Sequence, residues 1–364
     1  MSNEPTESLP RVAVVTVIYR CPEYMPGLLG SIAEVDYPRD RLELHLVDNG
    51  AGDGTLAAAR RAIERLGDRL PPVVMHEPGE NLGFAAGNNL ALRAVLERGA
   101  EYAFLLNPDA TFERPALREV VRAAASATDV GSVQSLLVLG SDPQVVNTSG
   151  NHIHFLGFGY VGGYLGARAD VPPGPREIAF ASGACVLLPV AALRRVGLFD
   201  ETLWLYHEDL DLGWRLRLAG LRNLVAPASV CRHFYEFSRT KSKWYWMERN
   251  RWIVVLKNYR LATVLLLLPA MLIADVGLLL MAARAGWLGA KLRSLGWFLR
   301  PSAWRYLARG RRAIAALRHV PDRALLRHFT AVIDYPDLRS PIVTWLVEPV
   351  WRVMLAVVRT LVRW

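Results

Sequence analysis

The sequence contains only three cysteines in 364 residues, Cys21, Cys185 and Cys231. An odd number of widely spaced cysteines excludes the disulfide framework of a small secreted domain, so we expect three free thiols in a reducing compartment. The first eleven residues also lack the basic start and the apolar run of a secretory signal. We therefore expect the amino-terminal half to stay in the compartment where it is made.

Two nucleotide-binding fingerprints are absent from the positions after the predicted strands, where they would bind a nucleotide. Neither a G-x-G-x-x-G sequence nor a Walker A sequence follows any of the strand-like runs. The first absence argues against a dinucleotide-dependent dehydrogenase, and the second argues against an ATPase.

Acidic residues are almost absent between residues 284 and 333. This basic stretch has eleven Lys or Arg residues and one acid, a net charge of +10, whereas the whole chain carries +9. A basic face of this kind can bind nucleic acid or anionic lipid. Apolar runs flank it, and its tryptophans suit the level of lipid headgroups, which favours a membrane surface. The tryptophans are Trp287, Trp297 and Trp304.

The two flanking apolar runs differ in character. Residues 261 to 283 include one charged residue, Asp275, and are long enough to cross a hydrocarbon core of ~30 Å. The alternative is a buried helical hairpin broken at Pro269. Residues 341 to 362 carry three charges, as an interfacial helix does. Because a single span would move the basic stretch across the membrane, we expect a monotopic or re-entrant anchor on its cytoplasmic face, with a single span as the alternative.

Residues 11 to 139 alternate short, β-branched apolar segments with segments of helical spacing. This alternation predicts an α/β fold with right-handed βαβ units and a doubly wound, mostly parallel sheet. Ligands of such a sheet bind beyond the carboxyl ends of the strands. We expect a catalytic domain at 1–257 and a basic, apolar helical region that associates with the membrane at 258–364. The expected strands lie at 11–19, 42–49, 72–78 and 102–109.

Polar residues follow these strands. Asp109 in NPDA can hold a hard divalent cation that bridges two phosphates, although Asp after Pro is also a common turn residue. Asp48 and Asn49 can accept a base N–H or a ribose hydroxyl. Asp53, in the same glycine-rich turn, is better explained as a helix cap. Small residues in ENLGFAAGNN, residues 80–89, allow the backbone to approach a nucleotide closely.

Three acids are crowded into HEDLDLGWR, residues 207–215. A carboxylate here can take the proton from an attacking hydroxyl. The alternative is a helix amino-terminus whose dipole favours acids. Asp211 lies four residues before Arg215, so we expect these two to pair along one helical turn. Further on, KWYWMERNRW, residues 243–252, is either a lid, a neck that enters the membrane, or packing.

Seven segments occur in a characteristic order: VAVVTVIYR, LVDNGAGDGT, NLGFAAGNN, LLNPDA, SGACVLLP, GLFDE and HEDLDLGWRLRLAG. Together they resemble glycosyltransferase family 2, most closely its bacterial rhamnosyltransferase-like members, over residues 11 to 260. The resemblance implies a Rossmann-like GT-A fold, a nucleotide-diphosphate sugar donor, a divalent metal (Mg²⁺ or Mn²⁺) and inversion at the anomeric carbon.

The resemblance also implies residue roles. Asp48 matches the base-binding aspartate, Asp109 the last acid of the D-x-D metal motif, and Asp209 the catalytic base of the E-D pair. Glu208 would orient the acceptor or raise the basicity of Asp209 by like-charge repulsion. His233 matches a histidine that contacts the metal or the diphosphate.

Two positions depart from the family pattern. The first strand ends in Ile-Tyr-Arg where Thr-Tyr-Asn is usual, so Arg20 would meet phosphate. Asn107 replaces the first acid of the metal motif, which lowers the charge of the ligand set. Arg239 and Lys241 can neutralise the leaving diphosphate or are simply surface charges. The remaining candidates for nucleotide-sugar binding are Tyr19, Asn81 and Gly83.

The sequence therefore predicts an inverting, metal-dependent glycosyltransferase in cell-envelope glycan synthesis. It would move a sugar, rhamnose by the closest resemblance, from a nucleotide-diphosphate donor to a lipid-linked or polysaccharide acceptor at an anionic membrane surface. One alternative is a membrane-tethered nucleic-acid-binding protein that uses residues 284–333, although we expect no nucleic acid partner. Another is a sugar nucleotidyltransferase. The sequence leaves the oligomeric state open.

Overall fold

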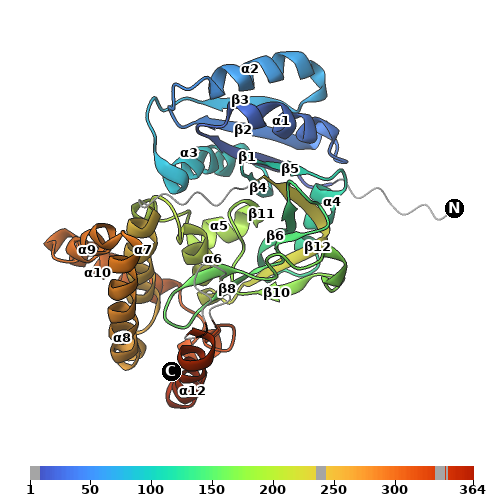
Figure 1. Cartoon of the computed structure of the whole chain (residues 1–364). Helices are drawn as coiled ribbons and strands as arrows, with labels where there is room; N and C mark the ends of the chain where they lie inside the picture. Colours follow the sequence, from blue (N-terminus) through green and yellow to red (C-terminus); the bar gives the residue numbers. More distant parts are fainter. Residues whose placement is uncertain (1–8, 235–242, 333–340, 342) are drawn as a thin grey trace.

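The computed structural model describes residues 9–234, 243–332, 341 and 343–364 (Figure 1). A ten-stranded sheet runs through the amino-terminal two thirds in the order β10-β12-β6-β11-β4-β1-β2-β3, with β5 and β7 paired at its side. Its strands are β1 (Val12–Ile18), β2 (Leu42–Asp48), β3 (Val73–His76), β4 (Tyr102–Leu106), β5 (Ala110–Phe112), β6 (Val130–Leu139), β7 (Val146–Thr148), β10 (Arg176–Ile178), β11 (Cys185–Pro189) and β12 (Arg222–His233). A small hairpin, β8 (Asn151–Ile153) and β9 (Gly159–Val161), lies outside it.

The sheet is doubly wound, as the alternating sequence predicts. Side chains point alternately to its two faces, so Val12 and Val14 of β1 pack on one side and Ala13 and Val15 on the other. The first face is covered by α1 (Met25–Glu34), α2 (Thr55–Leu66) and α4 (Ala116–Ala125). The second face is covered by α3 (Gly83–Arg98), α5 (Val190–Val196) and α6 (Glu208–Leu218).

Strand directions bring many chain segments to one edge of the sheet. β1, β2, β3 and β4 are parallel, so their carboxyl ends share an edge. β11 runs antiparallel to β4, which places its amino end at Cys185 on that same edge. β6 is antiparallel to β11 and parallel to β12, so β12 also ends there, at His233. We call this edge the carboxyl edge.

The carboxy-terminal helices gather away from α1, α2 and α3, at the lower left and bottom of Figure 1. They share a second core with the hairpin β8–β9 and with α6. The long apolar helix α8 is continuous through Pro269, so the alternative of a broken hairpin is wrong. By length and composition it is the one described helix able to cross a membrane. The helices are α7 (Lys243–Asn258), α8 (Leu261–Ala285), α9 (Leu288–Trp297), α10 (Pro301–Leu317), α11 (Asp322–Leu325) and α12 (Glu348–Leu361).

The basic stretch is less uniform than its composition suggests. Lys291 is fully buried and pairs with Glu248 of α7 and Asp275 of α8. Arg311 donates to backbone carbonyls at the end of α7, and Arg318 pairs with the buried Asp322. These three cations hold the helices together and are not available to a partner. The expectation that every tryptophan here faces headgroups is also wrong for one of them, Trp287, which is buried and stacked on Trp244.

Candidate active site

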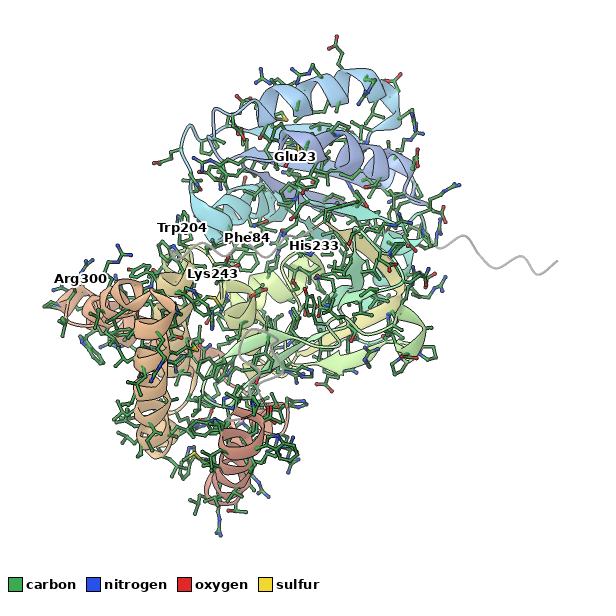
Figure 2. The ribbon with its side chains drawn as sticks, viewed as in Figure 1. Glu23, Phe84, Trp204, His233, Lys243 and Arg300 are labelled. Carbon is green, nitrogen blue, oxygen red and sulfur yellow. The ribbon has the colours of Figure 1, made fainter. Side chains whose placement is uncertain are left out.

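The expected site residues Asp48, Asn49, Asn107, Asp109 and His233 all lie at the carboxyl edge, where the sequence places them. Hydrogen bonds tie the neighbouring segments together there. Asn107 N donates to Ala184 O (2.8 Å), and the adjacent Gly183 N donates to Asp209 Oδ2 (3.1 Å). In Figure 2, Phe84 lies between Trp204 and His233 along this edge.

Asn49 shapes the wall that follows β2. Its Nδ2 donates to Gly83 O (3.1 Å) and its Oδ1 accepts from Leu82 N (3.1 Å), so both ends of the buried amide bind backbone. Asp48 Oδ1 accepts from Gly50 N at 3.3 Å and leaves the rest of the carboxylate to other partners. A nucleotide contact through Asp48 fits this geometry and stays a prediction, while the amide of Asn49 already joins two loops.

The amino-terminus of α3 needs glycine for two reasons. Gly83 has φ +76°, and a Cβ there would lie 2.5 Å from Trp204 Nε1. Asn81 Oδ1 accepts from Gly83 N at 2.8 Å and so holds the start of the helix. The N–H groups of residues 82 to 85 all donate to acceptors within the protein, so the two candidates build a fixed turn at the carboxyl edge.

The first-strand loop and the Asp53 turn adjoin each other. Arg20 has φ +52°, and its guanidinium lies 5.2 Å from the ring centroid of Tyr19. Asp53 Oδ1 accepts from Thr55 N (3.2 Å) and Thr55 Oγ1 (2.8 Å) at the start of α2, which confirms its interpretation as a helix cap. Cys21 also belongs to this corner, since Cys21 N donates to Thr55 Oγ1 at 3.0 Å. Like the other two cysteines, it is free and buried, as expected.

Asp109 and His233 face each other across β5 and β12. Asp109 Oδ1 is buried, lies 3.4 Å from His233 Nε2 and accepts no hydrogen bond from the described residues. His233 Nδ1 lies 3.1 Å from Asn147 Oδ1, a contact that orients the ring so that Nε2 points toward the carboxylate. A carboxylate oxygen and an imidazole nitrogen are both common ligands of divalent transition-metal cations, and this separation allows both to bind one ion.

The protein supplies only part of a metal coordination shell at this point. Within residues 9–234, 243–332 and 343–364, no three His, Cys, Asp or Glu side chains converge on one position. Asn107, which replaces an acid of the usual motif, adds no charge. A cation held by Asp109 and His233 therefore needs further oxygen ligands, which a diphosphate provides. The diphosphate candidates Arg239 and Lys241 lie outside the described residues.

The acid pair Glu208 and Asp209 begins α6 and is electrically asymmetric. Asp209 accepts two backbone hydrogen bonds, from Gly183 N at 3.1 Å and from Leu210 N at 2.7 Å, while burial raises its pKa above the usual range. Glu208 Oε2 is buried without a hydrogen-bond partner among the described residues. Burial and then the charge of Asp209 raise the pKa of Glu208 well above its usual value. The like-charge repulsion therefore acts on Glu208, rather than on Asp209 as the sequence suggested.

The third acid, Asp211, has a structural partner as predicted. Arg215 Nε donates to Asp211 Oδ2 at 2.8 Å, and Lys257 Nζ of α7 lies 2.8 Å from Asp211 Oδ1. Burial opposes ionisation of Asp211, but these two cations outweigh it and lower its pKa to about 2. The pair with Lys257 fixes α7 against the helix that carries Asp209.

Replacing Lys257 by Met is expected to lower the free energy of unfolding by about 3–5 kcal/mol, because it removes one of the two cations that compensate a fully buried carboxylate. Thermal unfolding at pH 7 measures this. Because the folded pKa of Asp211 is depressed, its contribution is present above its unfolded pKa of about 4 and is lost as the pH falls through about 2. The exposed pair Arg222–Asp129 provides the control, where Arg222→Met is expected to cost less than about 1 kcal/mol.

Sequence reasoning missed several residues that shape the site. Gly183 supplies a hydrogen bond to Asp209, Asn147 orients His233, and Trp204 covers Gly83. The only signal was the motif SGACVLLP, which concerns Gly183 alone and contains a strand-like apolar run after it. The strand is present as β11, but the preceding glycine carries the contact.

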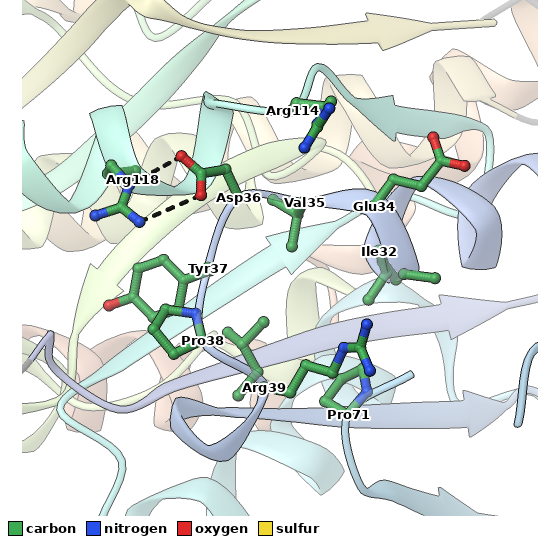
Figure 3. A pocket seen from close by; sticks show the side chains of 12 residues that line it. Ile32, Glu34, Val35, Asp36, Tyr37, Pro38, Arg39, Pro71, Arg114 and Arg118 are labelled. Carbon is green, nitrogen blue, oxygen red and sulfur yellow. Dashed lines mark hydrogen bonds and ion pairs between the residues drawn. The ribbon is translucent and has the colours of Figure 1, made fainter. Parts of the chain in front are cut away.

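A separate hollow lies at the opposite edge of the sheet. It has a volume of about 560 Å³ and is lined by residues of the turn after α1 and the start of α4, among them Tyr37, Arg39 and Arg114 (Figure 3). Arg118 in its wall forms two hydrogen bonds to Asp36, so its charge is already compensated. Because the amino ends of the strands meet here, this hollow is remote from the Asp109–His233 pair.

Comparison with known proteins agrees with this geometry. Residues 10–254 match the family model described as "Glycosyltransferase like family 2", and residues 172–362 match "Glycosyl transferase family group 2". The chain is 27% identical over 252 residues to an N-acetylglucosaminyl-diphospho-decaprenol L-rhamnosyltransferase of Mycobacterium tuberculosis. This alignment covers 63% of this chain and 76% of the mycobacterial protein. It is 25% identical over 144 residues to the low-salt glycan biosynthesis hexosyltransferase Agl10 of Haloferax volcanii, covering 39% and 45% of the two chains.

Two solved structures share the fold. A mannosyltransferase of Pyrobaculum calidifontis in complex with GDP-Man and Mn²⁺ superposes with a TM-score of 0.51 at 21% identity, covering 98% of this chain and 88% of that one. GalNAc-T7 with UDP, GalNAc and Mn²⁺ gives a TM-score of 0.56 at 13% identity, covering 70% and 48%. The architecture is that of a GT-A glycosyltransferase, followed by a helical region. The chain belongs to glycosyltransferase family 2, and its rhamnosyltransferase-like motifs agree with the mycobacterial relative.

Proposed function

We propose that this protein is an inverting, divalent-metal-dependent glycosyltransferase. It transfers a sugar, with rhamnose as the first candidate, from a nucleotide-diphosphate sugar to a lipid-linked acceptor of cell-envelope glycan synthesis. The observation that carries the proposal is the convergence of the Asp109–His233 pair and the carboxylate of Asp209 at one edge of the sheet. The mycobacterial relative, whose name specifies a decaprenol-linked acceptor, supports the choice of acceptor.

In the proposed reaction Asp209 is the base. Its carboxylate takes the proton from the acceptor hydroxyl as the oxygen attacks the anomeric carbon, opposite the departing nucleoside diphosphate. The two backbone donors hold the carboxylate in one orientation, and burial keeps its proton affinity high. Glu208, whose pKa is raised well above its usual value, is then suited to donate a hydrogen bond to the acceptor. This division of roles follows from the asymmetry of the pair.

The donor side is assigned to residues at the ends of β1, β2 and β4. Asp48 accepts from the base, and the turn of Asn81 and Gly83 forms the backbone wall beside it. Asp109 and His233 would hold the metal together with the diphosphate. The metal, Mg²⁺ or Mn²⁺, would supply charge neutralisation of the leaving group. The Mn²⁺ in both solved GT-A structures supports divalent metal use.

A membrane surface suits the helical region, which we assign to residues 258–364 beside a catalytic domain at 1–257. α8 exposes apolar side chains, including Leu272, Ile273 and Val276 at 52%, 66% and 58%. α12 exposes a second apolar stripe. Eight arginines of the basic stretch remain exposed, which favours anionic lipid: Arg284, Arg293, Arg300, Arg305, Arg309, Arg312, Arg323 and Arg327. Because Asp275 of α8 pairs with buried cations, we propose a monotopic anchor on the cytoplasmic face.

The double variant Ile273→Asp/Val276→Asp is expected to bind vesicles of phosphatidylglycerol and phosphatidylcholine at least about tenfold more weakly than the natural chain, because each exposed apolar side chain adds about 1.5–3 kcal/mol when buried. Vesicle co-flotation measures this. Leu165, which is 59% exposed in the turn after β9, provides the control, since Leu165→Asp should bind as before. Equal binding of all three proteins would contradict the anchor.

One assay tests the proposed function as a whole. The membrane-bound enzyme is offered a panel of nucleotide sugars with lipid extract and Mg²⁺ or Mn²⁺, and donor consumption and a labelled lipid product are scored. A labelled, lipid-extractable product formed from a single donor is expected. Release of pyrophosphate from nucleoside triphosphates would instead indicate a nucleotidyltransferase, and salt-sensitive binding of nucleic acid without transfer would indicate the other alternative.

A further inference from the structure

The loop that precedes Asp209 is held in an unusual conformation. Three of its four residues from 204 to 207 have positive φ values: Trp204 (+61°), Tyr206 (+64°) and His207 (+69°). Residues other than glycine rarely adopt backbone angles in this left-handed region, and they do so where the surrounding structure imposes them. Some neighbour must therefore hold this loop, which determines where the base lies.

The neighbour is Asn250 of α7, which has no exposed surface. Its Nδ2 lies 2.8 Å from Leu203 O, 3.0 Å from Leu205 O and 2.7 Å from Tyr206 O. The two protons of this amide thus serve three carbonyls, of which Leu203 O also accepts from Leu205 N at 2.7 Å. Without Asn250, the carbonyls of Leu205 and Tyr206 would lose the hydrogen bonds that hold them.

The adjacent Arg249 fixes the orientation of that amide. Its Nε and Nη2 donate to Asn250 Oδ1 at 3.0 and 2.8 Å, which leaves the Nδ2 of Asn250 to face the loop. Arg249 Nη2 also donates to Thr202 O, one residue before the loop turns. The two neighbouring side chains of α7 therefore bind the loop as a unit.

The loop is also clamped on its other side. Trp204 stacks on Trp246 of α7, with ring centroids 4.7 Å apart and planes at 22°, and the guanidinium of Arg249 lies 4.6 Å from the Trp246 ring. Trp204 O accepts from Phe84 N at 2.9 Å, at the start of α3. Figure 2 shows Trp204 beside Phe84. The loop is thus held between the start of α3 and α7.

A buried ion network braces α7 from behind. Arg251 pairs with Glu248 (3.3 Å) and with Asp275 of α8, while Lys291 of α9 lies 3.1 Å from Asp275. All four side chains are at most 6% exposed. Because α7 is fixed to α8 and α9 in this way, it is a rigid support for the loop rather than a mobile lid.

We propose that Asn250 is a positioning residue for the catalytic base: by binding the carbonyls of Leu203, Leu205 and Tyr206 it sets the place of Asp209 at the carboxyl edge. The proposal rests on the proposed function, in which Asp209 is the base. It adds that the first helix after the catalytic sheet completes the active site.

The test is Asn250→Ala in the full-length protein, with dTDP-rhamnose, N-acetylglucosaminyl-diphospho-decaprenol and Mn²⁺ as the probes. The kcat for transfer is expected to fall about 10- to 100-fold, because a small displacement of the base is costly. The donor KM and the metal-dependent binding of dTDP-rhamnose should stay within about twofold, since the Nδ2 hydrogen bonds of Asn250 go to the loop and not to Asp48, Asp109 or His233. An unchanged kcat would overturn the proposal.

Asn258→Ala is the matched control. Asn258 lies on the same helix and is equally buried, but its Nδ2 donates to Asp211 Oδ1 at 3.0 Å and not to the loop. The kcat of Asn258→Ala should stay within about twofold of the natural value, because the loop keeps its contacts. Its Tm is expected to fall, because buried hydrogen bonds contribute to stability wherever they lie. An equal loss of kcat in both variants would mean that Asn250 contributes only to general stability.

Hydrogen exchange gives a readout that does not depend on turnover. The amides of Phe84 and Ala85 both donate to Trp204 O, at 2.9 and 3.2 Å, so they report on the position of the loop. They should exchange faster in Asn250→Ala than in Asn258→Ala. If these amides exchange faster in Asn250→Ala while Asp209→Asn retains transfer, Asp209 is not the base, but the contact between Asn250 and the loop is confirmed. If these amides exchange no faster in Asn250→Ala, Asn250 does not hold the loop.

Discussion

Asp209→Asn is expected to bind the donor normally and to lose sugar transfer, with kcat lowered by about 10²- to 10⁴-fold. The amide has the shape of the carboxylate, but its single oxygen can accept only one of the hydrogen bonds that Gly183 N and Leu210 N donate to the two carboxylate oxygens. A Tm measurement therefore accompanies the assay, to check that the start of α6 keeps its structure. The amide cannot take a proton from the acceptor. Donor binding by calorimetry and transfer by product formation separate the two effects.

The pH dependence of the same reaction provides a second check on Asp209. Because burial raises its pKa, the base becomes protonated at a higher pH than an exposed aspartate would. Transfer should therefore fall on the acid side, with a midpoint above the ordinary aspartate value of about 4. Asp68→Asn, at an exposed position before β3 on the opposite edge, is the matched control and should keep full activity. Normal turnover of Asp209→Asn would refute the assignment.

Asp109→Ala is expected to abolish the metal-dependent part of donor binding. The variant removes the carboxylate that faces His233 Nε2 at 3.4 Å, and a single neutral imidazole retains little affinity for Mg²⁺ or Mn²⁺. In the natural protein, calorimetry should show donor binding that weakens when a chelator removes the metal. In Asp109→Ala, binding should be weak both with and without chelator.

The exposed Asp142 is the control for this prediction. It lies in the loop after β6, and its Oδ1 accepts from Gln144 N at 2.9 Å. Asp142→Ala should leave the metal response unchanged. A chelator response that survives in Asp109→Ala would place the metal elsewhere, and the Asp109–His233 pair would then be a structural contact.

The sequence predicted the sheet well because its signals are local. Short β-branched runs alternating with helical spacing predict βαβ units, and the right-handed crossover then places the carboxyl ends at one edge. Asp48 and Asp109 follow β2 and β4, so their common location came with the topology. The cap at Asp53 and the pair Asp211–Arg215 were predictable for the same reason, since each involves residues within one turn.

Charges and aromatic residues were harder to interpret from the sequence. The count of eleven cations between 284 and 333 did not reveal that Lys291, Arg311 and Arg318 are bound within the protein. Nor could it show that Trp287 is buried. Each of these outcomes depends on which helix packs alongside, and the partners are distant along the chain.

The sequence by itself determined the fold class, the edge at which polar residues gather and the family to which the chain belongs. Only the tertiary structure decided which acid of the pair has its pKa raised by its neighbour, how Asp109 meets His233, and how α7 holds the loop before Asp209. The physical reason is that a pKa or an unfavourable backbone angle depends on burial and on hydrogen-bond partners. Those partners come from segments that meet only when the chain folds.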